Sequence, residues 1–428
     1  VELCEEMFAP DSPLTRLGLD ACEIVTNGSG SHHQLRKLHT RVDLIRNGTR
    51  KNGGVYLYAN QSGCDGGRMG FDGCPMINLN GSFVAQGKQF TVADVEVVTA
   101  TVNLDEVVRH RIAMGSREVQ AAEAWRVERR TPRVRVEWSL CSSRERGDSS
   151  RKLSPPLDIR FHTPEEEIAM GPAVWLWDYL RRSGAARFLL PLSGGADSSA
   201  VTAIVASMCH LACDAARNGD AVVLADVRRL VGLAPDDNEH DALARVLNDP
   251  RELAKHVLHT AYLATEQSSA ATRQLAASLA AEVGASHLDL NIDTCVSAIV
   301  RVLETALKLN AKMRFQAHGG TRAEDLTLQN VQARLRMVFS YALAGMLPSV
   351  RGGGGYLLVL GTANVDEALR GYLTKYDCSS ADVNPIGSIS KLDLRRFLRW
   401  AATPVASGGL GLPTLDAVVR RKSSAELQ

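Results

Sequence analysis

The residues best suited to chemistry lie in the segment 191–198, which reads Pro-Leu-Ser-Gly-Gly-Ala-Asp-Ser. One apolar run precedes this segment and another, 200–208, follows it, so the pattern predicts a strand, a Gly-rich turn and a helix. Such a turn gathers unpaired backbone N–H groups at the positive end of a helix dipole, where phosphate binds. We expect Ser193 and Ser198 to donate hydrogen bonds to phosphate oxygens. Asp197 is then expected to bind magnesium, because Mg²⁺ takes carboxylates together with substrate phosphates.

This segment differs from the commoner phosphate-binding loops. It lacks the Gly-Lys-Ser/Thr ending of one such loop and the three spaced glycines of the dinucleotide-binding loop. An ordinary helix start, capped by Ser and Asp, has the same local pattern. The segment alone therefore leaves both interpretations open.

A second group of reactive residue types lies near the start of the chain. Cys4 stands where an apolar strand ends and a turn begins, a position at which a nucleophile is exposed beside a backbone N–H group. A later strand breaks into a loop of small, hydroxyl and His residues, 27–33, followed by Arg36 and Lys37. The loop hydroxyls and the two cations could hold the head group of an α-amino acid. A structural cysteine remains the alternative for Cys4.

Composition limits the class of protein. The chain has 428 residues, of which 45% are hydrophobic and 23% are charged, which is typical of a globular protein with two domains. Its net charge of +1 predicts no nucleic-acid partner. We see no apolar run of membrane-spanning length and expect no membrane partner. Nine cysteines without CxxC pairs favour reduced thiols and a cytoplasmic location.

The chain divides into regions with different patterns. Residues 1–141 alternate short apolar strands with Gly/Asn turns, and residues 142–162 form a polar linker. From 163 to 428 strands and helices alternate, which is typical of a doubly wound parallel sheet. We expect the charged stretch 216–250 to be a surface insertion on that sheet.

The same patterns predict individual elements. The first region is expected to contain strands 21–26, 55–59, 76–79, 95–103 and 134–140, a hairpin about Asn80-Gly81 and a helix over 105–124. The second is expected to contain strands 188–192, 256–262, 286–290 and 356–360, and helices 198–214, 270–283, 294–308 and 324–346. Its opening helix starts at Thr163, because Pro164 suits the first helical position and Glu166 completes a capping box.

The most distinctive run in the chain is 374–387, Thr-Lys-Tyr-Asp-Cys-Ser-Ser-Ala-Asp-Val-Asn-Pro-Ile-Gly. With the Ser-Gly-Gly-Ala-Asp-Ser loop and Cys4, it resembles the glutamine-dependent NAD⁺ synthetases of the eukaryotic type. The resemblance implies an α/β fold class: the C-terminal part of a nitrilase-like α-β-β-α sandwich, followed by a doubly wound parallel-sheet PP-loop domain of the adenine nucleotide alpha hydrolase-like kind. It places a partial glutaminase domain over 1–141 and a synthetase domain over 163–428.

The resemblance also implies a reaction. Glutamine is hydrolysed at a Cys nucleophile, and the ammonia passes to a second site, where ATP adenylates the nicotinate carboxylate of deamido-NAD⁺. Ammonia then displaces AMP to give NAD⁺. The implied cofactors are ATP and Mg²⁺, the partners are small-molecule substrates, and we expect a homo-oligomer. Another PP-loop amidotransferase, or a non-catalytic subunit, is the alternative.

Individual residues take their expected roles from this resemblance. Cys4 and Ser193 are the implied catalytic residues, and Asp197 with Glu367 the implied magnesium ligands. The implied glutamine-binding residues are Ser31, Arg36 and Lys37. The implied ATP-binding residues are Pro191, Leu192, Ser193, Gly194, Gly195, Ala196, Asp197, Ser198, Thr362 and Lys391. The implied deamido-NAD⁺ contacts are Arg334, Glu367, Lys375 and Asp382.

We expect the chain to be a fragment, truncated at its N-terminus and also at its C-terminus. In the family, a general-base Glu and a Lys lie upstream of the nucleophile, whereas this chain begins three residues before Cys4. The expected glutaminase site therefore keeps its nucleophile and lacks its base.

Glutamine hydrolysis by the 428-residue chain should accordingly be slow. An unassisted thiol has a pKa of about 8.5 and is only a few per cent ionised near pH 7. The expected rate is at least about 10²-fold below that of an intact family enzyme. An assay of ammonia release from glutamine measures it, and turnover equal to that of the intact enzyme would contradict the expectation.

Overall fold

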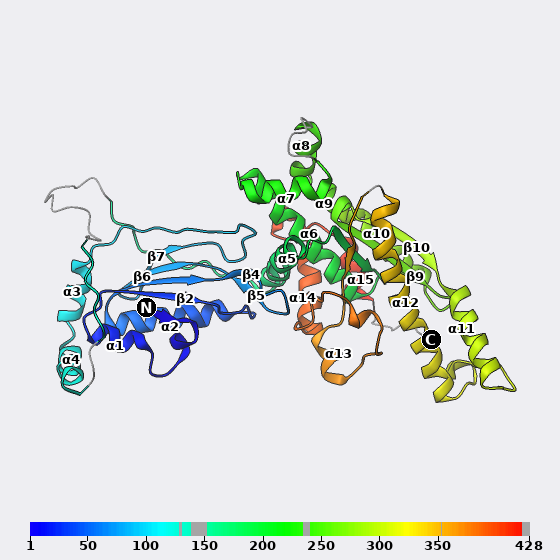
Figure 1. The fold of residues 1–428 in the computed structure, drawn as a ribbon, viewed down its shortest axis with the longest axis horizontal. Helices are drawn as coiled ribbons and strands as arrows, with labels where there is room; N and C mark the ends of the chain where they lie inside the picture. Colours follow the sequence, from blue (N-terminus) through cyan, green and yellow to red (C-terminus); the bar gives the residue numbers. More distant parts are fainter. Residues whose placement is uncertain (128–130, 138–151, 234–239, 352, 422–428) are drawn as a thin grey trace. The chain divides into compact units, whose positions relative to one another are not determined.

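The computed structural model describes residues 1–127, 131–137, 152–233, 240–351 and 353–421. These residues form two compact units, Val1–His162 and Thr163–Gln428, which Figure 1 draws in sequence colours. The expected strand 134–140 and the expected linker 142–162 both extend into residues outside the described ranges.

The first unit is built on a five-stranded sheet. The strands of the unit are β1 (Glu2–Leu3), β2 (Ile24–Ser29), β3 (Val55–Asn60), β4 (Ser62–Cys64), β5 (Gly70–Asp72), β6 (Met76–Leu79) and β7 (Ser82–Gln86). The sheet has the order β1-β2-β3-β6-β7, in which β1, β2 and β3 are parallel and β6 and β7 are antiparallel neighbours. The hairpin predicted about Asn80-Gly81 is confirmed as the β6–β7 connection.

The helices of this unit are α1 (Pro13–Leu19), α2 (Lys37–Asn52), α3 (Asp105–Ile112) and α4 (Gly115–Val127). The single helix expected over 105–124 is wrong, because Met114 N donates to Arg111 O at 3.1 Å and this tight turn closes α3. The strand expected over 95–103 is also wrong, because these residues pair with no described strand of the sheet. β-Propensity does not make a strand where no neighbour supplies the ladder of hydrogen bonds.

The two faces of this sheet contact different helices. Val42 and Ile45 of α2 pack on one face, in the same cluster as Tyr56 of β3. Val55, the preceding strand residue, lies in a second cluster with Val107 of α3. The strand residues thus alternate between two apolar clusters, as a side-chain period of two requires. Figure 1 shows α1 and α2 along the same side of the strands.

The described part of the expected linker packs on this first unit. Leu157 N donates to Phe83 O at 2.8 Å, and Arg160 N donates to Gln86 Oε1 at 2.8 Å. Ile159 between them is buried in the cluster formed by α2. The described residues of this segment therefore extend the first unit, which ends at His162.

The second unit contains a four-stranded parallel sheet. Its strands are β8 (Arg187–Pro191), β9 (Leu258–Ala264), β10 (Ser286–Asn291) and β11 (Leu357–Val359), in the order β10-β9-β8-β11. The chain moves outward from β8 to β9 and β10, and then returns to the other side of β8 with β11. This reversal makes a switch point between β8 and β11, which is where open α/β sheets bind ligands.

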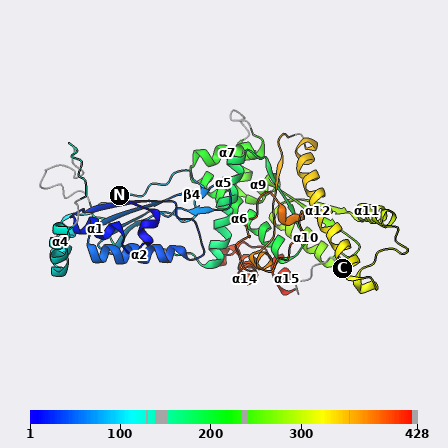
Figure 2. The same cartoon turned by 60° about the horizontal axis from the view of Figure 1, so that its bottom comes forward.

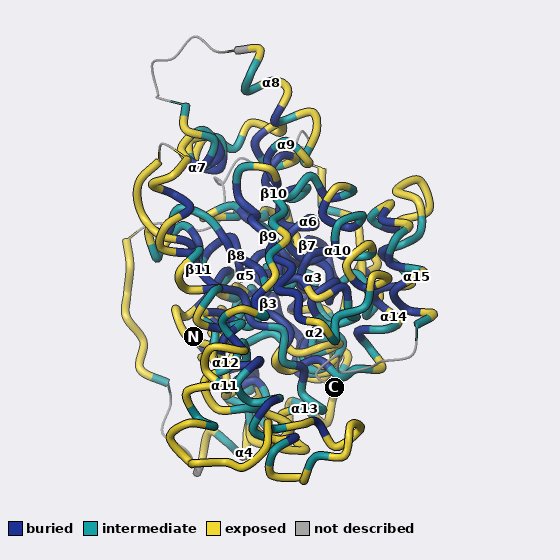
Figure 3. Tube along the Cα trace, turned by 90° about the vertical axis from the view of Figure 1, so that its right-hand side faces the viewer, coloured by how far each residue is buried: buried dark blue, intermediate teal, exposed yellow. Residues whose placement is uncertain are grey.

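Helices cover both faces of this sheet, as the alternating pattern predicted. The helices are α5 (Pro164–Ser183), α6 (Ala196–Arg217), α7 (Ala221–Val231), α8 (His240–Asn248), α9 (Pro250–Val257), α10 (Ala270–Val283), α11 (Asp293–Ala306), α12 (Arg322–Val350), α13 (Val365–Arg370), α14 (Lys391–Ala402) and α15 (Thr414–Arg420). Apolar side chains of α11 and α12 pack on one face, while α6 and α10 contact the strands from the other. Figure 2 shows α14 beside α15, and Figure 3 shows β8, β9 and α6 as largely buried.

The stretch 216–250 is folded against the core rather than inserted on the surface. Its helix α7 packs on α6 and buries Val223, Val227 and Leu230, which follow helical spacing along one face. Residues 234–239 lie outside the described ranges. Charged residues of α7 lie between these apolar positions, with Arg229 exposed and Asp226 paired with Arg181.

Helix α6 also corrects an expectation about membrane-spanning length. At 22 residues and a mean hydropathy of 1.4, it is long and apolar enough to cross a membrane. However, 78% of that apolar window is buried inside the protein, as in the central helix of a packed core.

A fully buried ion pair holds the 31–33 loop of the first unit. Arg41 Nη1 donates to Asp72 Oδ1 at 2.8 Å, and neither side chain is exposed. Arg41 also donates to Ser31 Oγ at 3.2 Å and to Ser31 O at 3.0 Å. Burial alone would raise the pKa of Asp72, but hydrogen bonding by His33 and the charge of Arg41 lower it to about 2. The pair therefore stays charged and keeps the loop in one conformation.

Acid should destabilise the first unit through Asp72. A carboxyl whose pKa is lower in the folded than in the unfolded chain contributes stability above about pH 4, and that stability is lost as the pH falls toward 2. The shift corresponds to about 2 kcal/mol. Urea unfolding of the full chain between pH 6 and pH 2 measures this loss of stability. Hydrogen-exchange mass spectrometry of the peptides that contain β2 and β3 reports on the first unit.

The matched variants are Asp72→Asn and Asp43→Asn. The Asp72→Asn variant should be less stable than the wild type at pH 6. Between pH 6 and pH 2 its free energy of unfolding should fall by about 2 kcal/mol less than that of the wild type. Asp43→Asn, at an exposed carboxylate, should keep the wild-type dependence on pH. An Asp72→Asn profile parallel to the wild type would show that this pair does not govern acid stability.

Candidate nucleotide-binding site

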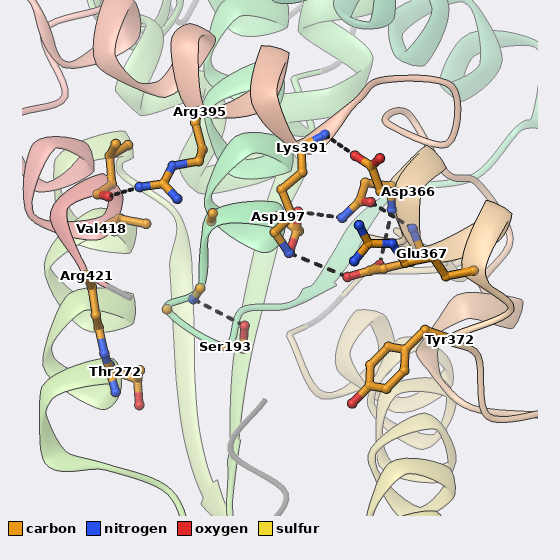
Figure 4. A pocket seen from close by; sticks show the side chains of 16 residues that line it. Ser193, Asp197, Thr272, Asp366, Glu367, Tyr372, Lys391, Arg395, Val418 and Arg421 are labelled. Atoms are coloured by element: carbon orange, nitrogen blue, oxygen red, sulfur yellow. Dashed lines mark hydrogen bonds and ion pairs between the residues drawn. The ribbon is translucent and has the colours of Figure 1, made fainter. Parts of the chain in front are cut away.

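The Gly-rich loop lies at the switch point of the sheet in the second unit. β8 ends at Pro191 and α6 begins at Ala196, so the predicted order of strand, turn and helix is confirmed. The loop borders a cavity of about 500 Å³, drawn in Figure 4. Residues 193–197 line this cavity, whereas Leu192 and Ser198, together with Pro191, do not.

Gly194 is required by the close approach of two backbones. Its φ is +75°, and a Cβ at this position would lie 2.2 Å from the carbonyl oxygen of Thr272. Thr272 belongs to the first turn of α10, so the loop is seated directly against that helix. Any side chain at 194 would force the loop and the helix apart.

Ser198 closes the loop from within. Its Oγ accepts a hydrogen bond from Ser193 N at 3.2 Å and lies 3.0 Å from Ser193 Oγ. Ser198 is only 2% exposed, whereas Ser193 is exposed and lines the cavity. Of the two hydroxyls that we expected to donate to phosphate, the structure brings Ser193 to the cavity and uses Ser198 to shape the loop.

A lysine joins the two predicted carboxylates. Lys391 Nζ lies 2.9 Å from Asp197 Oδ2 and 3.6 Å from Glu367 Oε1. Asn364 Nδ2 donates to the second oxygen of Asp197 at 2.9 Å, and Asn364 is fully buried. Asp197 follows β8 and Glu367 follows β11, so the two parallel neighbouring strands bring them to one edge of the sheet.

The pKa values of Glu367 and Lys391 are shifted by burial and by the charge of Asp197. Burial raises the pKa of Glu367, and the negative charge of Asp197 raises it further. Burial acts to lower the pKa of Lys391, but its hydrogen bond and charge interaction with Asp197 outweigh burial and raise it. The lysine is therefore held charged, while the carboxylate pair retains an excess of negative charge.

Helix starts position these side chains. Asn364 caps α13, with Glu367 completing the capping box at the third helical position. Lys391 is the first residue of α14, where the helix dipole disfavours a cation. The nearby carboxylates offset this cost, and Asp366 Oδ2 accepts from Lys391 N at 2.7 Å.

Sequence reasoning missed several cavity residues. Asn364 carried a signal, since an Asn three residues before a Glu at a helix start forms a capping box. Arg395 also carried one, because it lies four residues after Lys391 on the same face of α14. Arg421 and Tyr372 line the cavity without any local pattern that would have predicted it.

The donor set suits a magnesium ion shared with phosphate. Among the described residues, no group of three or more His, Cys, Asp and Glu side chains gathers as around a protein-bound metal. Asp197 and Glu367 provide two carboxylates with excess negative charge, and Mg²⁺ commonly takes one or two carboxylates plus substrate phosphates. The chemistry of these residues therefore fits the ion.

The expected deamido-NAD⁺ contacts other than Glu367 lie outside this cavity. Arg334 Nε donates to Lys375 O at 2.9 Å, which joins α12 to the loop after α13. Asp382 accepts from Tyr341 Oη at 2.8 Å and from Val359 N at 2.8 Å, so both of its oxygens are hydrogen bonded. The other expected ATP contact, Thr362, does not line the cavity either.

Cys4 stands at a bend directly after a strand. It begins a short 3₁₀-helix, Cys4–Phe8, immediately after β1, and its φ of +25° is unusual for a residue with a side chain. Glu2, fully buried on β1, accepts hydrogen bonds from Asn27 Nδ2 at 3.3 Å and from the Tyr56 hydroxyl. These bonds anchor the strand that carries the thiol.

The expected glutamine-binding residues are placed differently from one another. Burial lowers the pKa of Lys37, and Cys4 lies close enough to interact with it electrostatically. Ser31 is buried, and its hydroxyl accepts from Arg41, while Arg36 is exposed at the start of α2. Of these three residues, Lys37 is the one whose pKa the structure links to Cys4, while Ser31 is held by Arg41.

The parallel sheet, with a Gly-rich loop, two carboxylates and a lysine at its switch point, defines an α/β protein of the nucleotide-binding class. The model of the NAD synthase family matches residues 171–428, and the chain belongs to this family. The matched range contains the loop, the cavity and every side chain that lines it.

Curated relatives match the chain over its whole length. A glutamine-dependent NAD(+) synthetase of Mus musculus is 50% identical over 427 residues, which are 100% of this chain and 56% of that protein. The glutamine-dependent NAD(+) synthetase of Saccharomyces cerevisiae is 49% identical over 429 residues, which are 100% of this chain and 58% of that protein. The chain therefore spans a little over half the length of these relatives.

Solved structures share the fold. A glutamine-dependent NAD(+) synthetase from Cytophaga hutchinsonii matches 99% of this chain and 57% of its own, with a TM-score of 0.66 at 22% identity. One from Acinetobacter baumannii, solved in complex with ADP, matches 99% of this chain and 58% of its own, with a TM-score of 0.61 at 18% identity. At these identities the likeness concerns the α/β fold alone.

The substitution Gly194→Ala should disrupt the loop. The added methyl would meet the Thr272 carbonyl, and a positive φ costs a side chain about 1–3 kcal/mol. We expect ATP affinity, measured by calorimetry, to fall at least about tenfold. The control is Gly345→Ala in α12, where a Cβ meets no atom within 4 Å. Equal ATP affinity in both variants would mean that the loop does not bind phosphate.

Proposed function

We propose that the chain catalyses the ATP-dependent amidation of deamido-NAD⁺ to NAD⁺ through an adenylated intermediate. The observation that carries this proposal is the ammonium of Lys391 between Asp197 and Glu367, beside the Gly-rich loop. Membership of the NAD synthase family supports it, as do relatives named glutamine-dependent NAD(+) synthetases. Because the chain spans only part of those relatives, the activity of the whole protein is included in the proposal.

The site residues would act first on ATP. The backbone N–H groups of the 193–196 loop and the N-terminus of α6 would hold the polyphosphate. An oxygen of the nicotinate carboxylate bonds to the α-phosphorus, and pyrophosphate leaves with the electrons of the broken bond. Lys391 would offset the negative charge that develops in this step. Ammonia then bonds to the acyl carbon, loses a proton, and AMP leaves.

Asp197 and Glu367 would hold magnesium together with the phosphates. When bound, the ion neutralises phosphate charge and orients the group that is transferred. In the structure the ammonium of Lys391 provides the positive charge between these carboxylates.

The acid substrate would lie toward α12. Arg334 and Lys375 are both exposed and joined by a hydrogen bond, so they could contact phosphates or the carboxylate of deamido-NAD⁺. Asp382, which bonds to Val359 N and Tyr341, would act by holding this loop on β11. Thr362 remains a proposed ATP contact on the same connection.

For the first unit we propose the C-terminal part of a nitrilase-like α-β-β-α sandwich that supplies ammonia from glutamine. Cys4 would be the nucleophile, since its strained bend follows β1 directly. Lys37, which interacts electrostatically with Cys4, would help to bind glutamine, with Ser31 and Arg36 as further glutamine-binding residues. The first unit would then deliver ammonia to a second unit of the PP-loop type.

Self-association and a cytoplasmic location complete the proposal. Exposed apolar side chains on α11 and α12, including Val302, Val338, Met346 and Val350, would suit burial against a second copy of the chain. Small molecules remain the proposed substrates, with neither nucleic acid nor membrane as a partner.

The reaction can be tested with ammonia as the nitrogen donor. The chain should convert deamido-NAD⁺ to NAD⁺ with ATP and magnesium, releasing one AMP for each NAD⁺. Lys391→Met should slow this conversion at least about 10²-fold, because the charge beside the phosphates is lost. NAD⁺ and AMP are quantified by chromatography, with thermal unfolding as the check that the variant is folded.

Lys255→Met is the matched control. Lys255 is exposed on α9 and pairs with Glu252, so its loss should leave the rate unchanged. Release of ADP in place of AMP, or faster amidation of a different acid, would refute the proposed reaction.

A further inference from the structure

Two arginine side chains line a part of the cavity to which the proposed reaction assigns no role. Arg395 of α14 and Arg421, which directly follows α15, both line it. Figure 4 shows them on one side of the Gly-rich loop, with Asp197 and Glu367 on the other. The loop thus separates a basic end of the cavity from an end that carries the carboxylates.

Both arginines are anchored to the wall by backbone or hydroxyl groups. Arg395 Nη2 donates to Val419 O at 3.0 Å. Arg421 Nη2 donates to Ser269 Oγ at 3.1 Å, and Ser269 caps α10. The guanidinium groups are therefore held in place before any ligand arrives, which lowers the entropic cost of binding.

The charge distribution of the cavity favours an anion at this end. Its described lining residues include three carboxylates, those of Asp197, Asp366 and Glu367. In Figure 4 all three lie at the end of Lys391. An anion beside the arginines would therefore meet two guanidinium groups, and it would lie on the other side of the loop from Asp366 and Glu367.

The geometry of phosphoryl transfer indicates which end of the cavity would hold the attacking acid and which would hold the leaving group. In an in-line displacement the attacking oxygen and the leaving oxygen lie on opposite sides of the phosphorus. The proposed acid-binding residues Arg334 and Lys375 belong to α12 and to a loop that α12 holds, since Thr374 Oγ1 also donates to Asn330 Oδ1 at 2.9 Å. Tyr372, next to that loop, borders the cavity on the carboxylate side. The leaving group then faces the arginines.

We infer that Arg395 and Arg421 form a subsite for the β- and γ-phosphates of ATP, and so for the pyrophosphate that leaves. The inference rests on the proposed adenylation. In that step the carboxylate oxygen bonds to the α-phosphorus, the bond to the bridging oxygen breaks, and the bridging oxygen keeps the electron pair. The arginines give up no proton, because they bind the added charge on pyrophosphate through charge-assisted hydrogen bonds.

Calorimetric titration with inorganic pyrophosphate, and separately with AMP, tests this subsite. The variants are Arg395→Gln and Arg421→Gln, each in the full chain. Each should weaken pyrophosphate binding roughly tenfold or more and leave AMP binding within about twofold. The matched controls are Arg396→Gln and Arg420→Gln, since these neighbours are exposed, pair with Asp393 and Asp416, and should leave pyrophosphate affinity unchanged.

The outcomes separate this inference from the proposed reaction. Pyrophosphate affinity that falls no further than in the controls overturns the subsite, even if the chain makes NAD⁺. An equal loss of AMP and pyrophosphate affinity also overturns it, because the arginines would then support the whole cavity. A selective loss upholds it even if deamido-NAD⁺ is not the acid. If the Arg395→Gln variant unfolds through loss of its hydrogen bond to Val419, the pyrophosphate affinity of the Arg421→Gln variant alone tests the subsite.

Discussion

The ammonium of Lys391 is the interaction on which the nucleotide site depends. Asp197 and Glu367 follow neighbouring strands, and without a cation between them they would repel each other across the switch point of the sheet. Lys391, 2.9 Å from one and 3.6 Å from the other, removes that repulsion. It also fixes the first residue of α14 at the carboxyl edge of the sheet, and α14 carries Arg395 along the next turn. One ion pair therefore orders both ends of the cavity.

The first unit uses a related device at a buried position. Arg41, on the helix that follows the 31–33 loop, pairs with Asp72 and donates to Ser31. In each unit a loop after a parallel strand is held by a cation from a later helix. The difference lies in exposure, because the Arg41 pair has no contact with water while Lys391 borders a cavity. The first arrangement is suited to rigidity, and the second leaves the cation available to a ligand.

The sequence predicted what local pattern determines and failed where distant contacts decide. Strand, turn and helix around 191–198 followed from local pattern, whereas the pairing of Asp197 with Glu367 was implied by the family resemblance. The 95–103 segment has β-branched residues but pairs with no strand in the part of the chain that the structure describes. The charges of 216–250 concealed the apolar face of α7. The packed fold, rather than the neighbours in sequence, determines that the Ser198 hydroxyl bonds within the loop. It also determines that Arg421 lines the cavity.

The bond between Lys391 and Asp197 has a consequence for the order of folding. It joins residues 194 positions apart in the chain, so it belongs to the non-local contacts that form slowly because a long loop must close first. During synthesis the Gly-rich loop is made well before α14, so Asp197 lacks its Lys391 partner in that interval. The edge of the sheet that bears Asp197 therefore reaches its final charge arrangement only when α14 has docked beside the loop.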